Sequence, residues 1–286
     1  MDYINDDFEL DDEIEDFYRE NINGSNRLEL NDKYEGELTE EILEFLNSCK
    51  QLEIGEAFNS DISKIPESVI KISFTDFSLF NQSIDNLHDK VEILEFGEDS
   101  HFNQKVNHWP QGLKEIYFLG EFNQSIDNLP NGIQKIYFSS SSKFSQKVNQ
   151  WSNSLEILWF DYQNKYNQTF INLPNTLKYL YLGQYNLPLN NLPSNLKYLQ
   201  VGDAYSHHLD NLPIGLETLV IGDENWMSKF NLPLDFLPHH LKCLKILSFD
   251  FNQELNNLPK SLLYLTIHDK YRNKLPDIHV HFSSYY

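Results

Sequence analysis

The chain has 286 residues, of which 40% are hydrophobic and 23% are charged, a composition typical of a globular protein. Its 43 acidic residues outnumber 22 basic ones, and the net charge of -21 argues against nucleic acid and anionic membranes as partners. Two distant cysteines make no disulfide framework. The acidic amino terminus lacks a signal-peptide pattern, and no apolar run is long enough to span a membrane. We therefore expect a cytoplasmic protein.

The first segment of the chain, residues 1–26, is strongly acidic. Blocks of like charge are usually solvated, so we expect a flexible segment. Leu10, Ile14, Phe17 and Tyr18 would share one face of a helix, however. The alternative is therefore a segment that folds onto a basic partner.

The next segment, residues 27–57, is predicted to be an amino-terminal cap of the repeats that follow. The sequence indicates a helix within 38–48, a strand at 49–54 and a possible earlier strand at 28–30. Repeat proteins need atypical end units that shield their core from water.

Residues 58–270 contain ten repeated units of 19 to 25 residues. Each unit starts with an aromatic residue that Asn or Ser follows. The starts are Phe58, Phe80, Phe102, Phe122, Phe144, Tyr166, Tyr185, Tyr205, Phe230 and Phe251. A partial unit begins near Tyr271, so we expect residues 271–286 to be a carboxyl-terminal cap or a partial repeat.

Within a unit, the residue at offset seven from the aromatic is usually followed by proline, and apolar residues recur at offsets eleven, fourteen and sixteen. Alternation across the last two positions predicts a short strand. The proline and the short period leave little room for a helix, so an extended, turn-like or 3₁₀ return path is expected. One unit cannot bury its apolar side alone, whereas stacked units can. The prediction is a β-rich solenoid with about ten parallel strands and little helix.

These motifs carry a family resemblance. Phe-Asn-x-x-Ile/Leu, followed by Leu-Pro-x-x-Leu-x-x-Leu-x-Leu, resembles the FNIP repeat, a short relative of the leucine-rich repeat found in social amoebae and giant DNA viruses. The resemblance implies a leucine-rich-repeat-like, right-handed coil that binds other proteins, in the host cytoplasm if the protein is viral. Some members carry an amino-terminal F-box that docks onto a ubiquitin ligase. Residues 1–50 show no clear F-box, which puts that role in doubt.

The amide side chain after the repeated aromatic has a structural interpretation. At a fixed turn it can bond backbone groups of the neighbouring coil. The predicted ladder consists of Asn59, Asn81, Asn103, Asn123, Asn167, Asn186, Asn231 and Asn252.

The candidate binding surface comes from residues that the repeat leaves free. Offsets thirteen, fifteen and seventeen are expected to point away from the core, onto the concave surface of the sheet. Aromatic residues gather there in the central units. The candidates are Tyr117, Tyr137, Trp159, Tyr179, Tyr181 and Tyr198. Such an exposed aromatic surface is typical of an interface. The alternative is that these aromatic residues pair across neighbouring strands and stabilise the sheet.

No catalytic motif or cofactor-binding loop stands out, and no metal site is expected, His279 and His281 being the least unsuitable ligands. The sequence therefore predicts a non-enzymatic scaffold, without a cofactor, that presents the aromatic surface to a protein or peptide. Three alternatives stay open: substrate recognition for ubiquitin ligation, carbohydrate binding and charge mimicry of nucleic acid. The oligomeric state and the partner's identity do not follow from the sequence.

Overall fold

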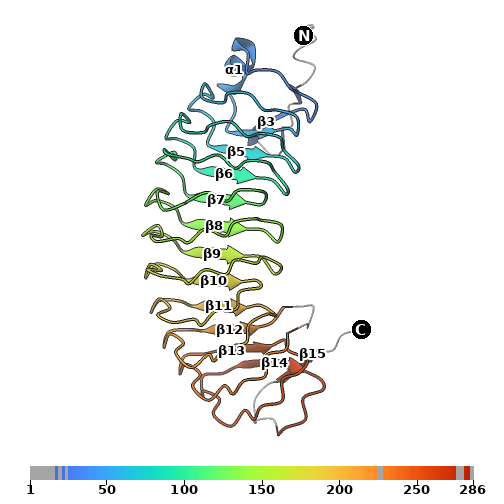
Figure 1. The fold of residues 1–286 in the computed structure, drawn as a ribbon, viewed down its shortest axis with the longest axis vertical. Helices are drawn as coiled ribbons and strands as arrows, with labels where there is room; N and C mark the ends of the chain where they lie inside the picture. The colour runs from blue at the N-terminus through green and yellow to red at the C-terminus, as the bar shows by residue number, and fades with distance from the viewer. Residues whose placement is uncertain (1–16, 19–20, 23–24, 224–227, 275–279, 284–286) are drawn as a thin grey trace, which may run out of the picture.

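The computed structural model describes residues 17–18, 21–22, 25–223, 228–274 and 280–283. They form an elongated solenoid in which the strands stack in chain order (Figure 1). Within the described residues the sheet has 15 strands, in the order β1-β3-β4 and then consecutively to β15, with β2 paired to β3. Neighbouring strands are parallel from β3 to β15, whereas β1 and β2 run antiparallel to β3.

Most strands of the repeated coils have four residues, and a single helix lies near the amino-terminal end of the described chain. The bounds are β1 Phe17–Tyr18, β2 Asn21–Ile22, β3 Ser25–Leu30, α1 Glu40–Leu46, β4 Gln51–Ile54, β5 Lys71–Phe74, β6 Ile93–Phe96, β7 Glu115–Phe118, β8 Lys135–Phe138, β9 Ile157–Phe160, β10 Tyr179–Leu182, β11 Tyr198–Val201, β12 Thr218–Ile221, β13 Cys243–Ile246, β14 Tyr264–His268 and β15 Val280–Ser283.

The repeated proline starts a tight turn that leads the chain into each strand. Its carbonyl oxygen accepts a hydrogen bond from the N–H three residues later, as from Val69 to Pro66 at 3.0 Å. The same bond forms at Pro110, Pro130, Pro174, Pro193, Pro213, Pro238 and Pro259. Because proline has no N–H and disfavours helix for the residue before it, the chain turns here. Over the described parts of residues 58–274, no helix interrupts the return path.

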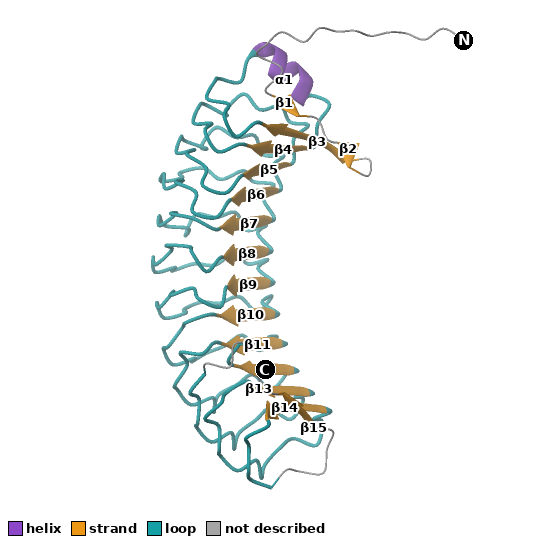
Figure 2. Ribbon diagram, turned by 90° about the vertical axis from the view of Figure 1, so that its right-hand side faces the viewer, coloured by secondary structure: helices purple, strands orange, loops and turns teal. Residues whose placement is uncertain are grey.

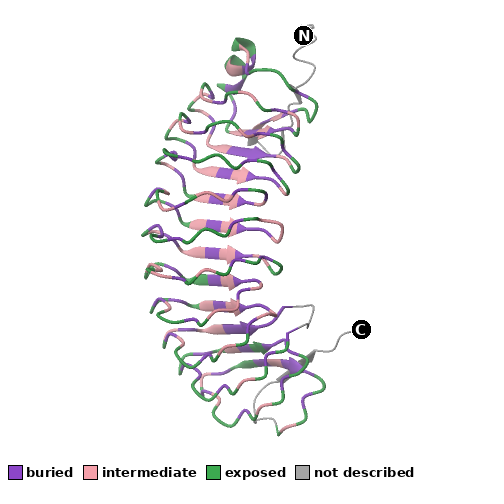
Figure 3. Cartoon of the chain, in the orientation of Figure 1, coloured by how far each residue is buried: buried purple, intermediate pink, exposed green. Residues whose placement is uncertain are grey.

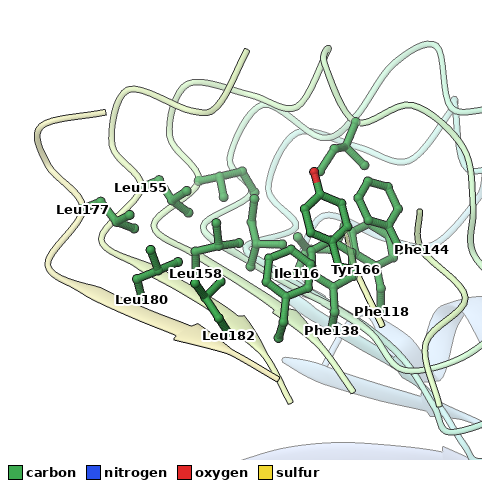
Figure 4. Packing of buried hydrophobic residues seen from close by; sticks show 14 of the residues in the cluster. Ile116, Phe118, Phe138, Phe144, Leu155, Leu158, Tyr166, Leu177, Leu180 and Leu182 are labelled. Atoms are coloured by element: carbon green, nitrogen blue, oxygen red, sulfur yellow. The ribbon is translucent and has the colours of Figure 1, made fainter. Parts of the chain in front are cut away.

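Two ladders of stacked aromatic rings fill one side of the core. The first contains the aromatic residue that starts each unit, from Phe58 through Tyr166, with ring centroids 5.8 to 6.4 Å apart. The second contains the last residue of successive strands, Phe74, Phe96, Phe118, Phe138 and Phe160. The ladders also contact each other, with Phe118 and Phe122 only 4.3 Å apart. Figure 4 shows several of these rings beside the buried leucines of neighbouring coils.

The sheet lines the concave side of the bowed solenoid, and the return segments form the convex side (Figure 2). Buried and partly exposed residues alternate along most strands (Figure 3). The predicted β-rich solenoid with a parallel sheet and little helix is therefore confirmed. The sheet extends past the ten predicted strands because β3, β4 and β15 continue the parallel stacking beyond the regular units.

The amino-terminal end of the described solenoid differs from the other coils. Along the chain, helix α1 connects β3 to β4, and its Ile42 and Leu46 are buried. Thr39 caps the helix because its hydroxyl oxygen accepts a hydrogen bond from the Ile42 N–H at 3.4 Å. Strand β1 covers the outer edge of β3, which would otherwise expose unpaired backbone groups.

Candidate functional site

Six aromatic residues on the concave face, which we call the aromatic strip, lie side by side across β7 to β11. They are Tyr117, Tyr137, Trp159, Tyr179, Tyr181 and Tyr198. Strand register places Trp159 directly between Tyr137 and Tyr181. The ring centroids are 5.9 Å apart for Tyr117 and Tyr137, 5.8 Å for Tyr137 and Trp159, and 3.8 Å for Trp159 and Tyr181. Tyr198 follows at 4.6 Å from Tyr181, so the ring contacts are continuous over five strands.

The strip is partly exposed, unlike the aromatic ladders of the core. Tyr179 is 40% exposed, and the other five residues are partly buried. Burial and the carboxylates of Asp161 and Glu98 raise the pKa of Tyr137 to about 12. Burial likewise raises the pKa of Tyr117, Tyr181 and Tyr198. These hydroxyl groups therefore stay protonated at neutral pH and can donate hydrogen bonds.

Several strip hydroxyl groups already have polar partners. Tyr117 donates a hydrogen bond to the Glu115 carboxylate at 2.6 Å and accepts one from Lys135 Nζ at 3.0 Å. The Lys135 ammonium also lies 4.7 Å from the centroid of the Tyr117 ring. Tyr198 donates to the side-chain oxygen of Gln200 at 3.1 Å. This surface thus combines apolar rings with groups that can orient a polar ligand.

The two edges of the concave face carry different charge. At the amino-terminal ends of the strands, acidic and basic residues of neighbouring coils form ion pairs. These are Glu92–Lys114, Glu156–Lys178, Glu217–Lys197 and Glu217–Lys242, at 2.6 to 3.0 Å. At the carboxyl-terminal ends, acidic residues predominate just after the strands: Asp76, Glu98, Asp161, Asp203 and Asp223. The central strip therefore has an acidic border on one side.

A shallow hollow lies where the aromatic strip meets this acidic border. Its lining includes Trp159, Tyr181, Asp161 and Asp223, and its volume is about 50 Å³. Gly183 and Gly202 lie between the two carboxylates, at the ends of β10 and β11. The repeat pattern predicts the two rings on this face, whereas only the structure brings the two carboxylates and the glycines beside them. A signal for this site is present in the sequence, because offset seventeen changes from Asp161 to Gly183 and Gly202 in successive units.

The expectation that offset seventeen lies on the concave surface is wrong for several coils. Ser139, Gly183 and Gly202 occupy this offset and are buried. The strand alternation stops one residue earlier, at Phe138, Leu182 or Val201, and the chain then turns tightly against the preceding coil. A side chain on Gly183 or Gly202 would collide with the backbone of that coil.

Asp203 gives a pH-dependent prediction for stability. Burial and the neighbouring Asp223 raise its pKa from 3.8 to about 6. The folded chain thus binds more protons than the unfolded chain between these values, so stability falls as pH rises through this window. Asp203→Asn keeps the oxygen that accepts the Asp223 N–H but removes the charge. We expect a gain of about 1–2 kcal/mol at pH 8, after allowing for solvent screening, and little gain near pH 4.

Thermal unfolding of wild type and Asp203→Asn at both pH values measures this effect. Asp250→Asn, at an exposed site, is the matched control for the change in net charge. An equal gain at pH 4 and pH 8 would contradict the assigned titration.

The asparagine ladder joins consecutive coils. The side-chain oxygen of Asn59 accepts the backbone N–H of Asn81 at 2.9 Å, and Asn81 accepts that of Asn103 at 3.0 Å. Equivalent bonds run from Asn123 to Asn103, Ser145 to Asn123, Asn186 to Asn167, Ser206 to Asn186 and Asn252 to Asn231. Each bond satisfies a backbone donor at the exposed start of a unit.

The remaining candidates from the sequence are a metal site and the acidic amino-terminal segment. Within the described part of the chain, no group of three or more His, Cys, Asp or Glu side chains could hold a metal ion. His279 and most of the acidic segment 1–26, including Leu10 and Ile14, lie outside the described residues; His281 is in β15. In the same described ranges, no helix combines the length and hydropathy needed to cross a membrane.

Comparison with solved structures gives a related fold. CroV588, described as a novel circular LRR protein, is 25% identical with a TM-score of 0.57; the match covers 91% of this chain and 41% of CroV588. YopM from Yersinia enterocolitica WA-314 is 18% identical with a TM-score of 0.44, covering 79% of this chain and 61% of YopM. The chain therefore spans less than two thirds of either protein. No curated protein matches it.

The repeats themselves match a family description. Residues 185–224 match the FNIP Repeat family model, within the ten units that share one plan. The likeness to CroV588 places these units on a leucine-rich-repeat fold, a fold typical of protein-interaction scaffolds. The predicted resemblance is thus confirmed: this chain carries FNIP-type repeats on a leucine-rich-repeat-like solenoid.

Proposed function

We propose that this protein is a non-enzymatic scaffold whose aromatic strip binds a protein or peptide. The continuous contact of partly exposed rings from Tyr117 to Tyr198 on the concave face is the observation that supports the proposal most directly. Tyrosine and tryptophan contribute a disproportionate share of the energy at protein interfaces. A solenoid presents such residues on an extended, concave surface.

The parallel sheet also forms where this offset holds no aromatic ring. The same offset holds Ser73 in β5 and Thr266 in β14, and these strands pair with their neighbours in the same parallel register. Parallel pairing in this sheet therefore does not require an aromatic residue at that position. Their concentration in five central strands supports a binding role.

The test replaces three strip residues in one variant, Tyr137→Thr/Trp159→Thr/Tyr181→Thr. Threonine suits β-strands, so the variant removes the rings while keeping the backbone preference. We expect a protein partner captured by the immobilised wild-type chain from cell lysate to bind this variant about 100-fold or more weakly. Mass spectrometry identifies the partner, and titration of that purified partner measures both affinities.

The matched control is Tyr264→Thr, because Tyr264 is 58% exposed on the same face, in β14, outside the strip. It should bind the partner as the wild type does. Retention of the same partner by the triple variant with unchanged affinity would refute the proposal. Unfolding of the triple variant would instead favour the interpretation that the rings stabilise the sheet.

A further inference from the structure

The hollow beside the aromatic strip brings aromatic rings together with carboxylates of the acidic border. It joins the rings of Trp159 and Tyr181 to the carboxylates of Asp161 and Asp223. Asp161 follows β9 and Asp223 follows β12, so about three strand spacings, or about 14 Å, separate the two chain positions. Gly183 and Gly202 line the hollow between the two carboxylates.

Asp161 differs in its ion pairing from the acidic residues at the opposite edge of the concave face. There, each of Glu92, Glu156 and Glu217 has a lysine partner. None of the ion pairs among the described residues includes Asp161, although that carboxylate interacts with the Tyr137 hydroxyl. The net charge of -21 adds a long-range attraction for cations.

The strip already shows how it accommodates a cation. At its amino-terminal end, the Lys135 ammonium lies near the Tyr117 ring and donates to its hydroxyl, while that hydroxyl donates to Glu115. Ring, hydroxyl and carboxylate thus act together on one positive group. The hollow offers the same three kinds of group, from Trp159, Tyr181 and Asp161.

We propose that the hollow binds an arginine side chain from a basic, extended peptide segment of the partner protein. The proposal rests on the proposed function and names the chemistry of the partner. The aliphatic stem of the arginine packs against Trp159 and Tyr181, and its guanidinium group pairs with Asp161 or Asp223. Arginine suits the site better than lysine because its planar, weakly hydrated head forms paired hydrogen bonds with a carboxylate and packs on aromatic rings.

The experiment selects from a random library of 12-residue peptides displayed on phage, with the full chain as target. The enriched peptides are then synthesised with arginine or with citrulline, which has nearly the same shape but no charge. We expect arginine-containing peptides to be enriched, and citrulline to weaken binding to wild type about tenfold. In Asp161→Asn/Asp223→Asn, the arginine and citrulline peptides should bind with nearly equal affinity.

The matched control is Asp210→Asn/Asp235→Asn, which makes the same change in net charge at exposed sites outside the hollow. It should keep the tenfold preference for arginine. If the double variant of the hollow has lower thermal stability, Asp161→Asn alone replaces it in the binding comparison, because asparagine keeps an oxygen that can accept a hydrogen bond from the Tyr137 hydroxyl. A preference for arginine that is unchanged in the hollow variants would overturn the inference.

The outcomes also separate this inference from the proposed function. Enriched peptides without basic residues, whose binding is lost in the Tyr137/Trp159/Tyr181 variant, would overturn the arginine site and support the aromatic strip. Failure to enrich any peptide, or binding that survives in that aromatic variant, would count against both.

Discussion

Phe118→Ala should destabilise the solenoid by about 3–5 kcal/mol, the cost of replacing a large buried aromatic residue. Phe118 is fully buried in the second core ladder, with ring centroids 6.1 Å from Phe96 and 5.4 Å from Phe138, and it contacts Phe122 of the first ladder at 4.3 Å. Because each coil contacts only its neighbours, the loss should appear first in the nearby strands. Hydrogen exchange should therefore show protection lost in β6 to β8 before β11 to β13.

Phe236→Ala is the matched control, since it removes the same side chain from a site that is 68% exposed. Its effect on thermal unfolding should stay within about 0.5 kcal/mol. A loss below about 1 kcal/mol for Phe118→Ala, or a uniform loss of protection along the chain, would contradict the ladder as the main support of the core.

Gly202→Ala should cost up to about 3 kcal/mol, although it adds only one methyl group. The new Cβ would collide with the backbone carbonyl of Gly183 in the preceding coil. The Gly202 N–H also donates to the Leu182 carbonyl oxygen at 2.7 Å, so the two coils cannot separate without weakening that bond. Denaturant unfolding measures the change in the free energy of unfolding.

Gly132→Ala supplies the contrast, because its Cβ would meet the nearest atom, the Leu113 carbonyl oxygen, at an ordinary 3.5 Å. Alanine allows the unfolded chain fewer conformations than glycine does. Gly132→Ala should therefore leave the free energy of unfolding unchanged or raise it by up to about 1 kcal/mol. Equal effects at the two glycines would show that close approach between coils does not set the requirement at Gly202.

Together these variants distinguish the support of the solenoid from its surface. Phe118 and Gly202 act between coils, whereas Tyr137, Trp159 and Tyr181 lie on β8, β9 and β10, in the coils between these two positions. At a temperature where the compared variants are all folded, the strip variant should therefore lose binding to the partner. If the core variants and the strip variant all lost binding, the cause would be unfolding rather than the removal of a binding surface.

The sequence by itself determined the contacts that recur in every coil. Units of one plan bring the same offset of neighbouring coils together, so the placement of Trp159 between Tyr137 and Tyr181 follows from counting along the repeat. The stacked rings from Phe58 to Tyr166 follow for the same reason. Each contact is reinforced by an equivalent one in the next coil, which is why the pattern is visible in the sequence.

Only the tertiary structure decided the features that depend on single departures from the repeat. The hollow is lined by Asp161, Gly183, Gly202 and Asp223, which follow four successive strands at offsets where the strand alternation has ended. The parallel stacking of β15 on β14 also lies beyond the last regular unit. Such features do not recur from coil to coil. Their position depends on how closely the backbones of particular coils approach each other, and this distance cannot be read from the repeat pattern.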